Sequence, residues 1–339
     1  MSKLVSVIIP CFNAQRWIAE AIDSCLQQTY PNIEVIVIDD GSTDNSLKII
    51  KSYGDRIIWK TGPNRGGNHA RNKGFSLAKG DYIQYLDADD YLLPEKIERQ
   101  VRCLEETGAD VVYGDWRHKH HQPDGTAFFD DIQVSGPKED FLESLLSNEN
   151  WVAPCAVLFT KAAVERCGVW DETLQVGQDR DFLISVAMNG EKFVYQSGCY
   201  SIYRRYGQVT VSTSCKLRWL ENHGLILRKV EQKLSQEGRF SEKYRQALAK
   251  SYYAMAREYL YKVDSIGYLN YLRLLEKSLT LFPEFRASNG AVYNLLQQVF
   301  GFKKAERIAY LMKQTPRLLA PKNSEMKQSI ASSVINSNN

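Results

Sequence analysis

The sequence predicts an α/β domain, in which a mixed, mostly parallel sheet is flanked by helices, followed by an all-helical C-terminal module. Over the first 215 residues, short β-rich runs alternate with helical patterns, which is typical of βαβ units. The run at 33–38, IEVIVI, is apolar apart from Glu34, as expected of a strand buried on both faces over most of its length. From residue 216 onward, Leu, Tyr and Ala recur at three- and four-residue spacing, which predicts helices alone.

The elements of the α/β domain follow one another in a regular order. Apolar, β-branched runs predict the strands, and apolar residues at helical spacing predict the helices between them. Residues 115–137 are polar and irregular, and we expect a surface excursion there. In chain order, strands are predicted at 4–9, 33–38, 56–59, 81–86, 110–113, 154–160, 193–196 and 200–204, and helices at 15–28, 45–52, 69–79, 94–107 and from about 179.

The 339-residue chain divides into parts of different composition. We predict an α/β domain at 1–215, a helical module at 216–320 and a flexible, polar tail at 321–339. Residues 1–215 carry 22 Lys and Arg against 30 Asp and Glu, and residues 216–339 carry 21 against 10. The basic part suits peripheral contact with anionic lipid, although solvated helix faces explain its charge almost as well. Nucleic acid is not an expected partner, because these charges follow no recognisable binding motif.

The sequence contains neither a membrane-spanning run nor a signal-peptide core. No segment approaches the roughly 18–20 consecutive apolar residues that a spanning helix needs, and the N-terminal apolar run is too short for a secretory signal. The seven cysteines are scattered without a CxxC pair, which argues against a disulfide framework or a zinc site. We therefore expect a cytoplasmic protein, with contact at the inner membrane face as an extension of that expectation.

Acidic residues directly follow two of the predicted strands. Asp39 comes after the run at 33–38, and Asp87 and Asp89 follow the strand at 81–86. Ligands of open α/β sheets bind beyond the carboxyl ends of the strands. A DxD pair there can hold Mg²⁺ or Mn²⁺, and a carboxylate can accept hydrogen bonds from a ribose or a base. Helix capping or a solvated turn is the simpler explanation of each acid taken alone.

A glycine-rich segment lies between these two acidic strand ends. Gly66 and Gly67 precede a predicted helix that contains Arg71, so backbone N–H groups and a guanidinium would lie near an anion at the sheet edge. A tight turn, with Arg71 paired to a surface acid, is the alternative. The chain lacks the GxGxxG and GxxxxGK[ST] loops, which disfavours a nicotinamide cofactor and excludes a P-loop NTPase.

Five motifs in this order resemble a known enzyme family. The segments VSVIIPCFN, EVIVIDDGSTD, NRGGNHARNKG, GDYIQYLDADD and QDRDF are together similar to glycosyltransferase family 2, whose members are inverting sugar-nucleotide enzymes of the GT-A fold. The resemblance covers residues 4 to about 205, and the helical remainder lies outside it. It implies a GT-A type catalytic domain at 1–215.

The resemblance assigns nucleotide-binding roles to residues after the first two strands. It implies that Asp39 contacts uracil and ribose. It further implies that Pro10, Phe12 and Asn13 form a wall beside the base, with Phe12 as the stacking face. Of these positions, Asp39 follows the second predicted strand, and Pro10, Phe12 and Asn13 follow the first.

The resemblance also assigns roles around the departing diphosphate. Asp89 is implied as the direct ligand of Mn²⁺ or Mg²⁺, Asp87 as a contact to ribose or to metal-bound water, and Arg71 as the basic residue near the diphosphate. Many relatives carry a Tyr-Arg-x-His stretch whose His completes the metal shell. Tyr206 stands at that position here, so a water or a diphosphate oxygen would fill the place.

The catalytic base of the family lies in an acidic pair at the start of a late helix. Here the pair reads Gln178-Asp179, and the resemblance gives Asp179 the role of general base. An N-cap of the following helix is the structural alternative. Asp181 is a rival candidate, but two residues along a helix correspond to roughly 200° of rotation, so it should face elsewhere. Trp151 and Trp170 are either stacking faces for an acceptor sugar or core residues.

The resemblance implies an inverting glycosyltransferase. It would move a sugar from a nucleotide-diphosphate sugar, a UDP-sugar by resemblance, to a hydroxyl of a glycan or lipid-linked acceptor in polysaccharide or surface glycan biosynthesis. Two alternatives are a catalytically silent sugar-nucleotide-binding scaffold that recruits partners through its basic helical tail, and a nucleotidyltransferase. The set Asp39, Asp89 and Asp179 argues against the first, and the lack of a glycine-rich phosphate loop after the first strand argues against the second.

Overall fold

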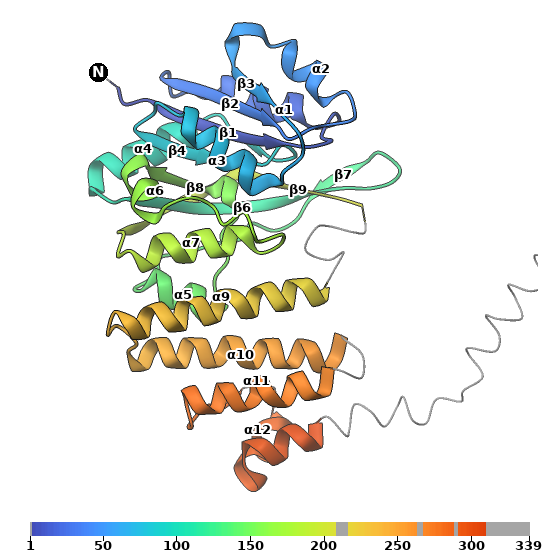
Figure 1. The fold of residues 1–339 in the computed structure, drawn as a ribbon, viewed down its shortest axis with the longest axis vertical. Coiled ribbons are helices and arrows are strands. Elements are labelled where there is room, and N and C mark those ends of the chain that lie inside the picture. Colours follow the sequence, from blue (N-terminus) through green and yellow to red (C-terminus); the bar gives the residue numbers. More distant parts are fainter. Residues whose placement is uncertain (1, 208–215, 263–266, 288–290, 310–339) are drawn as a thin grey trace, which may run out of the picture. The chain divides into compact units, whose positions relative to one another are not determined.

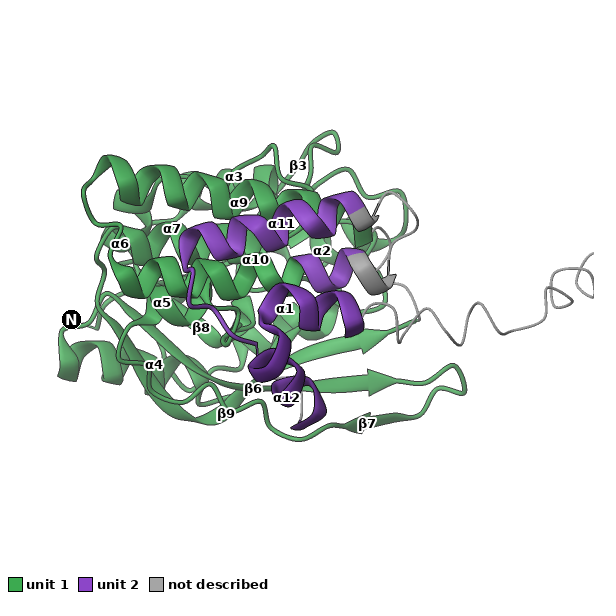
Figure 2. Cartoon of the chain, turned by 90° about the horizontal axis from the view of Figure 1, so that it is seen from below, with its two compact units in different colours: residues 1–255 green, residues 256–339 purple. Residues whose placement is uncertain are grey.

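A computed structural model describes residues 2–207, 216–262, 267–287 and 291–309 (Figure 1). The tail predicted at 321–339 lies outside the described residues. The chain divides into two compact units, residues 1–255 and 256–339 (Figure 2). The first unit contains the sheet and its helices, and it extends through the first long helix after the sheet.

A single mixed sheet forms the centre of the first unit. The strands have the order β3-β2-β1-β4-β8-β6-β9-β5, and β7 pairs with β6 at one side. Pairing is parallel within β3-β2-β1-β4 and between β6 and β9, and it is antiparallel at the remaining contacts. The strands are β1 Val5–Cys11, β2 Ile33–Asp39, β3 Ile58–Thr61, β4 Tyr82–Tyr85, β5 Tyr91–Leu92, β6 Val111–His121, β7 Ala127–Phe129, β8 Val157–Thr160 and β9 Phe193–Tyr206.

Helices connect the strands and continue after the last of them. The helices before or between strands are α1 Ile18–Leu26, α2 Ser46–Lys51, α3 Gly67–Leu77, α4 Lys96–Thr107, α5 Phe141–Leu146, α6 Lys161–Cys167 and α7 Gln178–Met188. After the sheet come α9 Lys216–Gln236, α10 Glu242–Lys262, α11 Gly267–Leu281 and α12 Ala291–Phe300. Of the helices among the described residues, none is both long and apolar enough to cross a membrane.

Helix α3 lies unusually close to the sheet. A Cβ atom on its Gly74 would lie 2.4 Å from Cγ2 of Ile8 in β1, which is closer than packed side chains approach. Ile8 is paired in the sheet with Ile36 of β2, and both side chains are fully buried. The glycine therefore lets α3 settle directly on β1 and β2, which brings Arg71 of this helix to the carboxyl edge of the sheet.

Strands β6 and β9 are longer than the sequence predicts. The parallel pairing of β6 with β9 continues to His121 and Tyr206, with register shifts around Asp115. β7 then runs back antiparallel to β6. The prediction of an irregular segment at 115–137 is therefore wrong where these two strands form a hairpin. The segment lacks an apolar alternation, and its strand character comes from pairing with β9, which local pattern does not reveal.

Both units contain helices that follow the sheet, and the boundary between the units falls within α10. In the first unit, Leu220, Leu227 and Leu234 of α9 recur at seven-residue spacing and are fully buried. In the second unit, the fully buried Glu306 accepts hydrogen bonds from Arg257 Nη1 at 2.9 Å, from Tyr271 at 2.7 Å and from Tyr293. The polar centre of the second unit is thereby satisfied within that unit.

A buried lysine gives the first unit a measurable pH dependence. The Lys96 amine is 1% exposed and donates to Gln84 Oε1, and burial lowers the pKa of Lys96 from 10.5 to about 7. Between these two values the unfolded chain binds more protons than the folded one, so stability rises with pH. We expect the free energy of unfolding of the wild type, minus that of Lys96→Met, to rise by about 1 kcal/mol per pH unit from pH 7.5 to 9 in urea titrations.

The matched control for this measurement is Lys73→Met, because Lys73 is exposed on α3. The wild type and Lys73→Met should follow parallel curves of unfolding free energy against pH. A constant difference between the wild type and Lys96→Met over the same range would contradict the prediction.

Candidate active site

The candidate residues gather at the carboxyl ends of β1, β2 and β4. Cys11 at the end of β1 pairs with Asp39 at the end of β2, and Ile8 pairs with Tyr85 at the end of β4. Asp87 follows β4 directly, so it lies at the same sheet edge as Asp39. The edge expected from the sequence pattern is the edge that the structure forms.

The Asp39 carboxylate is held in a fixed orientation below this edge. It is 1% exposed, and its two oxygens accept hydrogen bonds from the Ser42 amide at 3.3 Å and from Thr61 Oγ1 at 2.6 Å. Thr61 closes β3, and sequence reasoning did not single it out because one threonine at a strand end carries no distinctive signal. The Asp39 carboxylate is thus positioned by its neighbours before any ligand arrives.

The loop after β1 is locked to the loop after β2. Asn13 has a left-handed backbone, with φ of 50°. Its Oδ1 accepts from the Thr43 amide at 2.8 Å, and its own amide donates to Ser42 Oγ at 3.0 Å. The neighbouring Phe12 is 49% exposed, and Pro10 is the second-last residue of β1. An exposed ring on a fixed loop is the arrangement that base stacking needs.

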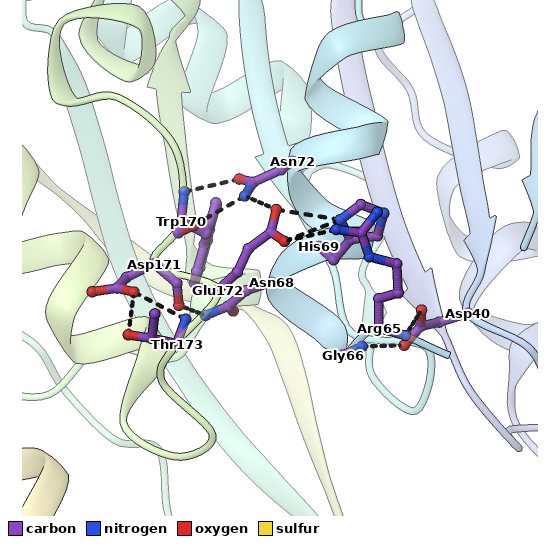
Figure 3. Close-up of polar contacts among 10 residues, drawn as sticks. All are labelled: Asp40, Arg65, Gly66, Asn68, His69, Asn72, Trp170, Asp171, Glu172 and Thr173. Carbon is purple, nitrogen blue, oxygen red and sulfur yellow. Dashed lines mark hydrogen bonds and ion pairs between the residues drawn. The ribbon is translucent and has the colours of Figure 1, made fainter. Parts of the chain in front are cut away.

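The glycine-rich segment binds an acid of its own chain. The Asp40 carboxylate accepts hydrogen bonds from the amides of Arg65 and Gly66, both at 2.8 Å (Figure 3). Gly41, with φ of 77°, lies so close to the same segment that a Cβ atom would meet the Asn64 nitrogen at 2.7 Å. The Gly66 amide, in the segment expected from the sequence to face an anion, is therefore used by Asp40, as is the amide of Arg65. The guanidinium of Arg71 is left as the cationic group nearby.

Arg71 lies against the first acid of the DxD motif. Its Nη2 donates to Asp87 Oδ1 at 2.7 Å, and its Nη1 donates to Asn68 Oδ1 at 3.1 Å. The guanidinium also lies over the Trp170 ring, 4.6 Å from its centroid. Its Nε is buried without a hydrogen-bond partner among the described residues. An acid, an amide oxygen and an aromatic face thus fix the cation beside Asp87.

Asp89, the second acid of the motif, contacts the residue that departs from the family pattern. The Tyr206 hydroxyl donates to Asp89 Oδ2 at 3.1 Å. Burial, followed by the charge of Asp87, raises the pKa of Asp89. Arg71 and Tyr206 each occupy one oxygen of a different acid, so each carboxylate keeps a second oxygen that these partners do not use. Two crowded carboxylates with oxygen donors fit Mg²⁺ or Mn²⁺, which would relieve the repulsion.

A buried arginine, Arg204, holds the turn that contains Asp89 and Asp90. The Arg204 side chain is fully buried, donates to the Asp89 carbonyl and to Glu20 Oε2, both at 2.6 Å, and its guanidinium lies 4.2 Å from the Trp17 ring centroid. Its amide donates to Asp90 Oδ1 at 2.8 Å. Arg204 belongs to the stretch that ends at Tyr206, but its contact with Glu20 could not be foreseen from the sequence, because the two residues are 184 positions apart.

Asp179 lies in the first turn of α7 and is held by an indole. Trp151 Nε1 donates to Asp179 Oδ2 at 2.8 Å. Asp181, two residues on, is 5% exposed and pairs with Lys229 of α9 at 3.2 Å, so it faces away from Asp179 as the helical rotation predicts. Trp151 was expected either in the core or against an acceptor sugar, and its link to Asp179 is a role that the sequence did not reveal.

Trp170 belongs to the core between Arg71 and α7. It is 3% exposed, and its ring stacks on Phe182 of α7 with the centroids 4.2 Å apart and the planes 4° from parallel. Asp179 borders the small apolar hollow that these rings line together with Tyr85. The core alternative for Trp170 is therefore confirmed, and an acceptor-stacking role for it is wrong.

Polar contacts of three α3 residues join this helix to the segment that leads into α7 (Figure 3). Asn72 exchanges two hydrogen bonds with the backbone of Trp170, at 2.8 and 2.9 Å. Asn68 Nδ2 donates to the Asp171 carbonyl at 2.6 Å, and His69 Nδ1 lies 3.1 Å from Glu172 Oε2. The helix that carries Arg71 is thus fixed to the segment before the helix that carries Asp179.

The N-terminal region matches a family of known enzymes. Residues 6–162 match the model of glycosyl transferase family 2. The match covers just under half of the chain, and over this region the resemblance found in the sequence is confirmed.

Curated relatives are similar over part of their length. The chain is 37% identical over 184 residues to an uncharacterized glycosyltransferase of Rickettsia typhi, which covers 53% of this chain and 57% of the relative. It is 39% identical over 133 residues to glycosyltransferase GlyG of Streptococcus pneumoniae, which covers 38% and 44%. The chain therefore spans about half the length of the curated relatives it matches.

Solved structures show the same fold at low sequence identity. S. aureus TarS in complex with UDP-GlcNAc has a TM-score of 0.63 and 20% sequence identity, and the similarity covers 83% of this chain and 82% of that chain. The complex of TarS with UDP has a TM-score of 0.58. The predicted fold class, a GT-A type mixed sheet flanked by helices with further helices at its C-terminal side, is thereby confirmed.

Proposed function

We propose that this protein is an inverting glycosyltransferase that moves a sugar from a UDP-sugar to an acceptor hydroxyl. The observation that carries the proposal is the convergence of Asp39, Asp87 and Arg71 at one sheet edge, with the segment before α7 tied to the same helix as Arg71. The fold shared with a UDP-GlcNAc complex of TarS supports a UDP-sugar as donor. The catalytic domain would comprise residues 1–215, and residues 216–320 would form a helical module.

The nucleotide would lie across the ends of β1 and β2. Asp39, oriented by Ser42 and Thr61, would accept hydrogen bonds from uracil and ribose. The exposed Phe12 ring would stack on the base, and Pro10 and Asn13 would complete the wall beside it. The loop needs no rearrangement for this, because Asn13 already ties it to the neighbouring strand end.

The diphosphate would leave beside Arg71 and the DxD acids. Asp89 would hold Mn²⁺ or Mg²⁺, with Asp87 toward ribose or a metal-bound water, and the ion would act as a Lewis acid on the diphosphate. Arg71 would exchange its contact with Asp87 for the diphosphate and stabilise the negative charge that develops there. Trp170 keeps the guanidinium in place during this exchange.

Asp179 would act as the general base on the opposite side of the anomeric carbon. Its Oδ1 would accept the proton of the acceptor hydroxyl while that oxygen attacks, and Trp151 would hold Oδ2. A single in-line displacement breaks the bond to the diphosphate and inverts the configuration. The acceptor would be a glycan or a lipid-linked glycan, and the basic helices after the sheet would contact anionic lipid near it.

Donor binding and transfer test the proposed function together. The protein is titrated with UDP-, GDP- and dTDP-sugars in thermal-shift measurements, with Mn²⁺ or with EDTA. A UDP-sugar with Mn²⁺ should raise the melting temperature most. Slow release of UDP from that donor should follow, and NMR of a transfer product should show the inverted anomer. Absence of any sugar-nucleotide binding, or a product that retains the configuration, would overturn the proposal.

Replacing Trp151 tests how the base is positioned. Trp151→Phe keeps a ring against Trp116 and Tyr203, whose centroids lie 4.8 and 5.8 Å away, but removes the hydrogen bond to Asp179. We expect kcat to fall about tenfold, because a hydrogen bond to a charged group contributes about 1.5 kcal/mol or more. The donor KM should stay unchanged in steady-state kinetics. Trp219→Phe on α9 is the matched control, and equal kcat in both variants would contradict the prediction.

A further inference from the structure

The hairpin of β6 and β7 carries a cluster that the proposed reaction does not use. His118 and His120 are two residues apart on β6, so their side chains lie on the same face of this strand. Asp130 is the residue after β7, on the strand that pairs with β6. Among the described residues, these three are the group of His, Cys, Asp and Glu whose ligand atoms all lie within 4.8 Å of one another. All three side chains are partly exposed, so an ion can reach them from solvent.

One carboxylate oxygen lies at the centre of the cluster. His118 Nδ1 is 2.5 Å and His120 Nε2 is 3.5 Å from the same Oδ2 of Asp130. The other oxygen, Oδ1, accepts the His118 amide at 2.8 Å, and the Asp130 amide donates to the His118 carbonyl at 3.2 Å. The backbone therefore fixes the carboxylate, while both imidazoles approach the oxygen that the backbone leaves free.

The two imidazoles are held by rings as well. His120 stacks on Phe128 of β7, with centroids 4.9 Å apart and planes 11° from parallel. The His118 ring meets the edges of Trp116 and Tyr203, at 4.8 and 5.5 Å. Rings locked in this way lose little conformational freedom when they bind an ion, which favours binding.

We propose that His118, His120 and Asp130 form a zinc site, separate from the DxD acids. Two imidazoles and one carboxylate are the ligand set that Zn²⁺ takes when it keeps a fourth position for water. Tetrahedral ligands with Zn–N bonds of about 2.0 Å lie about 3.3 Å apart, so His118 and Asp130 would separate by less than about 1 Å. A hydrogen bond between His118 and Asp130 would explain the position of one imidazole. A shared zinc ion explains why both imidazoles approach the same oxygen of Asp130.

The ligands explain why the sequence did not reveal this site. The cysteines argued against zinc, and none of them takes part here. His118 and His120 have the i, i+2 spacing of a strand, and the segment lacked a predicted strand, so their common face was not foreseen. The pairing of β6 with β7 supplies Asp130 as the third ligand.

Metal titration of the full-length protein tests the zinc site. The protein is stripped with EDTA, desalted and titrated with Zn²⁺ by calorimetry and with Co²⁺ by visible absorption. We expect one equivalent of Zn²⁺ that is lost in His120→Phe, which keeps the ring on Phe128 and removes the ligand nitrogen. Asp130→Asn should lose it too, together with the d–d absorption of bound Co²⁺.

Two variants separate this site from its neighbours. His121→Phe alters the adjacent histidine, whose ring lies 4.6 Å from the Trp17 ring, and it should keep the zinc equivalent. Asp89→Asn should keep it as well, because the DxD acids are a different site. Far-UV circular dichroism and metal-free melting curves confirm that each variant is folded. A wild type that binds no zinc, a folded His120→Phe that binds as the wild type does, or loss in Asp89→Asn would overturn the proposal.

Discussion

Asp179→Asn should lower kcat for glycosyl transfer by about 10²- to 10⁴-fold and leave donor affinity nearly unchanged. The substitution keeps the shape of the side chain and an oxygen that can accept from Trp151 Nε1, now 2.8 Å from Asp179 Oδ2, but it removes the proton acceptor. The proposed donor site lies at the sheet edge and does not include Asp179, so calorimetry with UDP-sugar should give the same Kd as for the wild type. Single-turnover transfer with saturating acceptor measures the loss directly.

Asp181→Asn is the matched control for this experiment. Asp181 lies in the same helical turn, but it contacts Lys229 and faces α9. Transfer kinetics of this variant should equal those of the wild type. Asp179 would be removed from the mechanism if Asp179→Asn turned over normally, or if both variants lost activity equally because α7 had shifted.

Asp89→Asn should abolish the metal dependence of donor binding and lower turnover by about 100-fold or more, since a bound divalent ion contributes several kcal/mol to charge stabilisation. The pKa of Asp89 is raised by burial and by the charge of Asp87, and a bound cation would favour the ionised form of Asp89. In the variant, the Kd of UDP-sugar measured with Mn²⁺ should equal the Kd measured with EDTA.

Asp55→Asn controls for the loss of one negative charge. Asp55 is exposed in the turn Gly54–Arg56 and should retain the full effect of Mn²⁺ on donor affinity. Donor binding by Asp89→Asn that remains as Mn²⁺-dependent as in the wild type would place the ion elsewhere. Equal affinity of the wild type with Mn²⁺ and with EDTA would contradict the metal role itself.

The strand ends could be predicted because they follow from local pattern. The apolar run that ends at Asp39 and the strand before Asp87 define their own positions, and parallel neighbours place both acids at one edge. The rotation of a helix placed Asp181 away from Asp179. The family resemblance then supplied roles that no spacing could give.

What the sequence left out depends on contacts between distant segments. Trp151 lies 28 positions from Asp179, and Glu20 lies 184 positions from Arg204, so neither pair forms a motif. The hairpin of β6 and β7 is polar, and its strand pairing comes from β9. The amides of Arg65 and Gly66 illustrate the same limit, because only the fold shows that Asp40 occupies them.

Asn68 and Asn72 of α3 form hydrogen bonds with the segment Trp170–Asp171, which leads into α7. These contacts connect the helix that carries Arg71 to the helix that carries Asp179. Arg71 on α3 and Asp179 on α7 therefore cannot move independently of each other. Substitutions at Asn72 and at Asp179 should therefore be energetically coupled, with a double-mutant effect that differs from the sum of the single effects. In the proposed reaction, the scaffold, and not the substrates, would set the distance between the donor and the acceptor.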